Sequence, residues 1–142
     1  MFKYKIIDNF LYEEDFNILC SINENITKTE VIHNRNTINK NGHVHSGWLE
    51  VEFIKKLHNN YHDRAIKLLK ELAQEKVKLY DYSLFELVQT GSHYIWPIHT
   101  DQLEKLLSII IYLKPEVNRG TMIYDGIDKS NPTEIEWKQN RA

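Results

Sequence analysis

The hydrophobic period of the sequence changes near residue 78, and this change restricts the possible folds more than any other feature. From about residue 48 to residue 76, apolar side chains recur at spacings of four and three, which predicts one face of a long amphipathic helix. The residues on this face are Phe53, Leu57, Tyr61, Ala65, Leu68 and Leu72. Over residues 79–90 the period becomes two, which predicts a strand or a pair of strands. Helices followed by short strands predict an α+β fold, a sheet sandwich or barrel with helices on one side.

The segments before and within the long helix extend this prediction. We expect a short edge strand over residues 2–7 and a helix over residues 13–24, whose acidic first turn suits the helix dipole. Residues 33–47 are polar and predict a loop with a ragged hairpin around Asn41-Gly42. Ser46 is a candidate N-cap of the long helix. The Asn59-Asn60 pair is a candidate break of that helix into two.

The last third of the sequence is expected to be extended, with turns between short strands. The expected segments are an extended stretch at 97–101, a buried β-branched strand at 105–113, and strands at 120–125 and 134–138. Turns are expected from Pro115 to Gly120 and from Gly126 to Pro132. No internal repeat or linker interrupts the chain, so residues 1–142 are interpreted as a single domain.

Composition excludes several classes of function. The net charge of −2 provides no basic field, so we expect no nucleic-acid partner. The longest apolar run, from Leu106 to Leu113, is far shorter than the roughly 20 residues that span a bilayer, so we expect no membrane segment. The N-terminus shows no signal peptide, and the single Cys20 fits a reducing compartment. We therefore expect a cytoplasmic protein.

The residues with the clearest chemistry lie in Pro97-Ile98-His99-Thr100-Asp101. Positions i and i+2 of a strand point to the same face, so His99 and Asp101 would present an imidazole and a carboxylate side by side. These are two of the three ligands of a 2-His-1-carboxylate site for non-haem Fe(II). By itself the pattern is weak, and a His–Asp hydrogen bond at a strand end explains it better than a metal site does.

The residues that follow this pair form a series with a specific resemblance. Lys105, Leu107-Ser108, Tyr112-Leu113, Gly120-Thr121 and Tyr124 follow the His-Thr-Asp triplet at close spacing. This series resembles the double-stranded β-helix core of 2-oxoglutarate/Fe(II)-dependent oxygenases, in particular the prolyl-hydroxylase-like branch. The opening stretch Ile6-Ile7-Asp8-Asn9-Phe10-Leu11 before an acidic helix start is similar to the usual opening of these domains. The resemblance implies a jelly-roll core buttressed by N-terminal helices, and Fe(II) and 2-oxoglutarate as cofactors.

The resemblance also implies roles for individual residues. His99 and Asp101 match the first two metal ligands. Tyr112 matches a position whose hydroxyl helps to hold the co-substrate carboxylate, although a core tyrosine is an equal alternative. Gln89 and Tyr94 are candidates to line the same pocket, against ordinary packing or surface roles. The reaction class would be hydroxylation of a small molecule or of a protein side chain.

The chain departs from the family pattern in its metal ligands. All seven histidines lie at or before position 99, so the expected second histidine ligand is missing. Arg141 is the only late basic residue beyond Lys138 and is a poor candidate for the carboxylate clamp. We therefore expect a domain incomplete at its C-terminus, with weak or no activity. The alternative is a non-catalytic remnant of the same fold that acts in binding or assembly.

Incomplete closure of such a fold has a consequence for association. The sheet edge made by residues 120–138 would be exposed, which predicts a homodimer or strand exchange through that edge.

Two other pairs of closely spaced histidines lie earlier in the sequence. His43 and His45 fit an H-x-H metal pair, but a solvated loop is the better interpretation. His58 and His62, spaced i and i+4 on a helix, have a spacing that chelates zinc, but they are offset from the buried stripe and are interpreted as surface residues. A cupin-like metal protein is disfavoured because the region around His99 lacks the glycines of a cupin motif.

Overall fold

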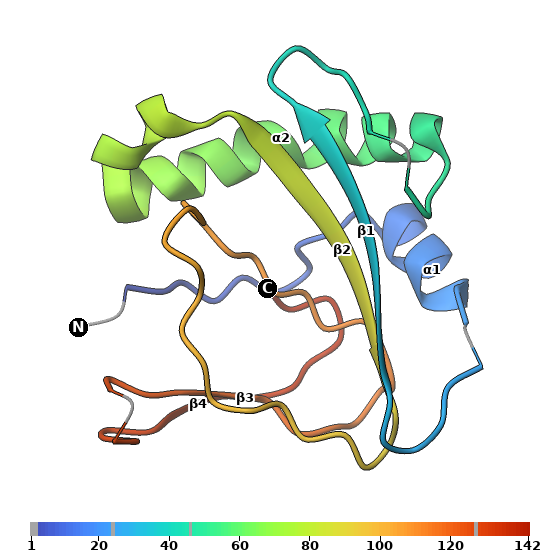
Figure 1. Ribbon diagram of the computed structural model, residues 1–142, viewed down its shortest axis with the longest axis vertical. Coiled ribbons are helices and arrows are strands. Elements are labelled where there is room, and N and C mark those ends of the chain that lie inside the picture. The colour runs from blue at the N-terminus through green and yellow to red at the C-terminus, as the bar shows by residue number, and fades with distance from the viewer. Residues whose placement is uncertain (1–2, 24, 46, 127) are drawn as a thin grey trace. The chain divides into compact units, whose positions relative to one another are not determined.

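The computed structural model describes residues 3–23, 25–45, 47–126 and 128–142 (Figure 1). Its elements are α1 (Glu13–Ser21), β1 (Val31–Asn39), α2 (Val51–Ala73), the 3-10 helix η1 (Gln74–Leu79), β2 (Tyr82–Thr90), β3 (Thr121–Ile123) and β4 (Thr133–Ile135). The described residues form two separate antiparallel strand pairs, β1–β2 and β3–β4, and no closed barrel. The general α+β class is therefore confirmed.

The chain divides into two compact units. The central unit contains residues 25–45, 47–97 and 103–107, and the terminal unit contains residues 3–23, 98–102, 108–126 and 128–142. Within the described residues, no helix is long and apolar enough to cross a membrane.

The central unit is built from the β1–β2 pair and α2. The two strands are antiparallel, and their register runs from Val31 opposite Thr90 to Asn39 opposite Tyr82. Alternate positions of β1 are buried at Asn36 and Ile38. The Asn36 amide accepts a hydrogen bond from the Leu49 backbone N–H at 3.1 Å, which fixes the strand to the chain just ahead of α2. Helix α2 contacts β1. It crosses the β1–β2 pair at the end where β1 finishes and β2 begins (Figure 1).

Helix α2 is continuous, so the predicted break at Asn59-Asn60 is wrong. The reason is the apolar stripe, which runs through that point without interruption. The buried residues of the stripe are Ile54, Leu57, Tyr61 and Leu69. This stripe is rotated slightly from the predicted one but has the predicted period. The predicted N-cap, Ser46, lies outside the described residues.

The predicted loop over residues 33–47 is wrong for residues 33–39, which belong to β1. Polar residues form this strand because those on its inner face find partners, as Asn36 does, while those on its outer face remain exposed. The hairpin predicted at Asn41-Gly42 is confirmed. Gly42 has φ 80° and donates its N–H to the Asn39 carbonyl at 2.9 Å, and a β-bridge joins Ile38 to Val44.

The terminal unit contains the β3–β4 pair, in which Thr121, Met122 and Ile123 face Ile135, Glu134 and Thr133. Both strands are shorter than predicted. A Cβ on Gly120 would lie 1.8 Å from the Ile135 carbonyl oxygen, so the backbone packs too closely here for a residue with a side chain. Residues 3–7, 97–101 and 105–113 form no strand. The predictions of strands at 2–7 and 105–113 are therefore wrong for the described residues.

Those segments are held by isolated backbone contacts instead of ladders. Ile7 and Ala142 exchange two backbone hydrogen bonds, at 2.8 and 2.9 Å. The Tyr112 N–H donates to the Arg141 carbonyl at 3.0 Å, and the Asn140 N–H donates to the Tyr112 carbonyl at 2.7 Å. β-branched composition alone does not make a strand where only one or two residues find a backbone partner.

Asn140 joins the first and last segments of the terminal unit. Its side-chain oxygen accepts the Leu11 N–H at 2.8 Å, and its amide donates to the Leu11 carbonyl at 2.9 Å. Arg141 adds an ion pair, since its guanidinium lies 2.6 Å from the Asp8 carboxylate. These contacts surround a small core that includes Phe10, Leu11 and Tyr112.

Candidate metal-binding segment

His99 and Asp101 both lie in the terminal unit, on an exposed extended segment without ladder pairing. The strand geometry on which their alignment was predicted is therefore absent, although both side chains are accessible. The Ser108 hydroxyl donates a hydrogen bond of 2.5 Å to Asp101 Oδ2. This bond restrains the carboxylate.

Ser108 was not predicted as a site residue. Its signal in the sequence is that it interrupts the apolar run from Leu106 to Leu113. A hydroxyl in such a run needs a hydrogen-bond partner, and Asp101 provides it seven residues away.

The donor set does not fit a complete iron site. Among the described residues, no three histidine, cysteine or acidic side chains come together in a way that holds a metal ion. The facial arrangement needs three protein ligands, and His99 and Asp101 supply two. The pair remains a prediction for a weak metal site, and no catalytic step follows from it here.

Tyr112 is buried, with 7% of its surface exposed. Its hydroxyl donates to Thr121 Oγ1 at 2.6 Å and also lies 3.4 Å from the Ile135 carbonyl oxygen. Its ring stacks on Trp137 with centroids 4.4 Å apart. These contacts favour the alternative that Tyr112 is a core tyrosine, because its hydroxyl is already engaged inside the terminal unit.

Gln89 and Tyr94 belong to the central unit, whereas His99, Asp101 and Tyr112 belong to the terminal unit. Gln89 lies in β2, and the Tyr94 ring packs edge-on against Trp96 with centroids 5.4 Å apart. The structure gives Tyr94 an aromatic packing role. Its part in a co-substrate pocket, like that of Gln89, stays a prediction.

A cluster of polar and charged side chains lies beside Trp96, and it was not predicted from the sequence. The ring of His33 meets Trp96 edge-on at 5.7 Å, and His33 Nδ1 lies 2.5 Å from Glu86 Oε1. Arg35 Nε donates to the same oxygen at 2.9 Å. Burial raises the pKa of Glu86, but the hydrogen bonds from His33 and Arg35 outweigh it and lower the pKa. His33 was missed because its segment was interpreted as a loop, whereas β1 places it beside β2.

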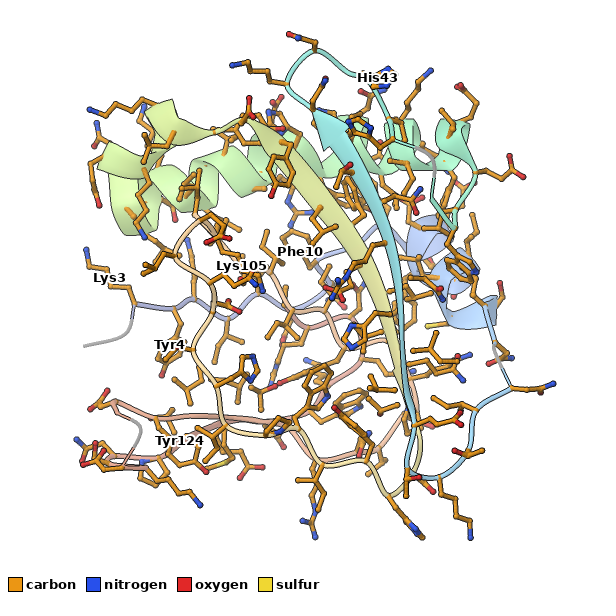
Figure 2. All side chains as sticks on the ribbon, viewed as in Figure 1. Lys3, Tyr4, Phe10, His43, Lys105 and Tyr124 are labelled. Atoms are coloured by element: carbon orange, nitrogen blue, oxygen red, sulfur yellow. The ribbon has the colours of Figure 1, made fainter. Side chains whose placement is uncertain are left out.

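The two remaining histidine pairs differ from each other. His43 lies in the exposed loop after β1, where its ring meets that of His45 edge-on at 5.1 Å (Figure 2). This agrees with the solvated loop that was expected. His58 and His62, in contrast, are half-buried and stacked at 4.4 Å, so their interpretation as surface residues is wrong. The cause is Tyr80, which follows η1 and places its ring 5.0 Å from that of His62.

Comparison with known proteins leaves the family open. No protein-family model, no curated protein and no solved structure matches the chain.

Proposed function

We propose that this chain is a 2-oxoglutarate/Fe(II) oxygenase-type domain with an incomplete metal site, which has little or no hydroxylase activity. The observation that carries the proposal is the His99-Thr100-Asp101 triplet with the series that follows it as far as Tyr124. Two structural facts are compatible with it. Both candidate ligands are exposed within one unit, and Ser108 orients the acid.

The proposal includes the finer fold. We interpret the β1–β2 and β3–β4 pairs as parts of a jelly-roll core, with α1 and α2 as buttressing helices. The substrate would be a small molecule or a protein side chain, and the single Cys20 suits a reducing cytoplasm. A second copy would cover the edge made by residues 120–138. Light scattering checks this, and a monomer at high concentration would count against it.

The decisive experiment is an anaerobic titration of the full chain with Fe(II) and 2-oxoglutarate. We expect weak uptake with a visible charge-transfer band, and loss of that band in His99→Ala and in Asp101→Ala. Ser108→Ala should weaken uptake less, because it removes only the bond that orients the acid. His43→Ala is the matched control, since it removes an exposed histidine outside the segment. A band that is unchanged both in His99→Ala and in Asp101→Ala would refute the assignment.

A non-catalytic remnant of the same fold is the second candidate. It is favoured by the engagement of the Tyr112 hydroxyl and by the lack of a third ligand among the described residues. Such a remnant would take up no iron at any co-substrate concentration and would form no succinate. The same titration therefore separates the two candidates.

A further inference from the structure

We propose that His58 and His62 form a second, independent metal site on α2, which binds a divalent transition-metal ion of the zinc, nickel or copper type. Helix α2 runs without a break from Val51 to Ala73, so positions 58 and 62 lie one turn apart on the same face. Two imidazoles at this spacing are a known donor arrangement for such ions.

The imidazole rings of His58 and His62 are in contact in the structure. Their centroids are 4.4 Å apart with an interplanar angle of 29°, so no other side chain separates them. The terminal torsion of histidine is broad, and small rotations therefore bring one nitrogen of each ring toward a shared ion. The Tyr80 ring packs against His62 with centroids 5.0 Å apart and reduces the number of orientations open to the His62 ring. The conformational entropy lost on binding is correspondingly small.

Nδ1 of His58 is buried and has no hydrogen-bond partner among the described residues. A metal ion coordinated by Nδ1 would supply the partner that this buried nitrogen lacks.

The other histidine pair shows why the helix matters. His43 and His45 also have neighbouring rings, but they lie on an exposed loop with rings edge-on at 89°. Binding there would have to order the loop first, which opposes association. With only two protein donors, the α2 site would complete its shell with water, and imidazole-preferring ions would be favoured over magnesium or calcium.

The test is a titration of the full chain with Ni²⁺ alone at pH 7.5, followed by calorimetry and by broadening of histidine ring signals in NMR. We expect one ion per chain and loss of the His58 and His62 signals before all other histidine signals. His62→Ala should weaken binding at least tenfold. Adding Asp63→His to that variant restores the histidine count at the wrong spacing and should not restore affinity. His43→Ala should bind as the wild type does.

Three results would overturn the proposal. They are no uptake by the wild type, an affinity restored by Asp63→His, and broadening that begins at His43 or His99. The NMR measurement uses the unmodified chain, so it decides the matter even if a helix variant does not fold. The nickel titration contains neither Fe(II) nor 2-oxoglutarate, and the oxygenase proposal is tested by a band that requires both, so failure here and failure of the oxygenase proposal are distinguishable.

Discussion

Asn140 provides the sharpest test of how the terminal unit is held together. Its side chain makes two hydrogen bonds to the backbone of Leu11, which is 5% exposed. Each hydrogen bond contributes about 0.5–1.5 kcal/mol net, so the pair contributes about 1–3 kcal/mol. Asn140 also has φ 59°, a conformation that asparagine and glycine tolerate better than alanine does.

Asn140→Gly removes both hydrogen bonds and keeps the backbone conformation. Asn9 is the matched control, because it has φ 53° and its side chain forms no hydrogen bond with the described residues. Asn9→Gly therefore reports the backbone cost alone. We expect Asn140→Gly to lower the free energy of unfolding by about 1–3 kcal/mol more than Asn9→Gly does. Asn140→Ala should cost about 1 kcal/mol beyond Asn140→Gly.

The assay is urea denaturation followed by the fluorescence of Trp137, which stacks on Tyr112 inside the terminal unit. Trp48→Phe and Trp96→Phe provide a background in which Trp137 is the sole tryptophan. A local signal is needed because two compact units need not unfold together. If Asn140→Gly and Asn9→Gly destabilise the chain equally, the proposed role of the Leu11 contacts is refuted.

Three further predictions address charge and capping. Because the pKa of His58 is lowered in the folded state, the unfolded chain binds more protons near pH 6, and stability should fall as the pH drops below about 6.5. In His58→Gln this slope, measured by urea denaturation between pH 7.5 and 5.5, should be smaller. The pKa of Asp8 is strongly lowered by hydrogen bonds from Arg141 and Lys138. The stability it contributes is present above about pH 3.9 and lost in acid. Asp8→Asn should therefore lower Tm at pH 7, and by less in 1 M salt than in 50 mM salt; an equal loss at both would exclude an ionic origin. Lys114 Nζ caps the end of α1 by donating to the Cys20 and Ile22 carbonyls at 2.7 and 3.1 Å. Lys114→Met should speed amide exchange in α1 by up to about tenfold, equivalent to about 1.4 kcal/mol of local opening; unchanged exchange would contradict the capping role.

Local periodicity explains which elements could be predicted. Helix α2 was predicted because its apolar residues recur within a few turns, and a stripe of this kind determines a helix almost independently of its neighbours. Strand β2 was predicted for the same reason, since its exposure alternates along its whole length. The β3–β4 pair was predicted because turn-forming residues from Gly126 to Pro132 separate two short extended runs.

Long-range partners explain the errors. β1 is polar, and it becomes a strand because β2 pairs with it some 50 residues later, with Arg35 opposite Glu86. The run from Leu107 to Ile111 is the reverse case, an apolar segment that does not become a strand. It is strongly β-forming, yet Ile110 is 60% exposed and the segment joins no ladder. Neither outcome is encoded in the segment itself, because strand formation depends on a partner elsewhere in the chain.

Only those features of the candidate site that depend on spacing along the chain could be predicted from the sequence. The spacing of His99 and Asp101 identified two donors, but the hydroxyl that restrains Asp101 comes from Ser108, which was interpreted as part of a strand. The pairing of His58 with His62 was visible in their spacing. Its partial burial was not, because it depends on the turn after η1 that brings Tyr80 to His62.

The two proposed metal sites must be distinguished from each other in any metal titration of the full chain. Imidazole-rich sites bind zinc, nickel and copper more tightly than iron(II), so the α2 pair should take up the first three in preference. Oxygen donors follow the same order of affinities, so the His99 segment is distinguished by its dependence on 2-oxoglutarate and not by a preference for iron. Iron uptake in His99→Ala would by itself be ambiguous, because His58 and His62 remain. Repeating the titration in His58→Ala/His62→Ala removes that ambiguity: a co-substrate-dependent band that survives there and disappears with Asp101→Ala must arise from the His99 segment.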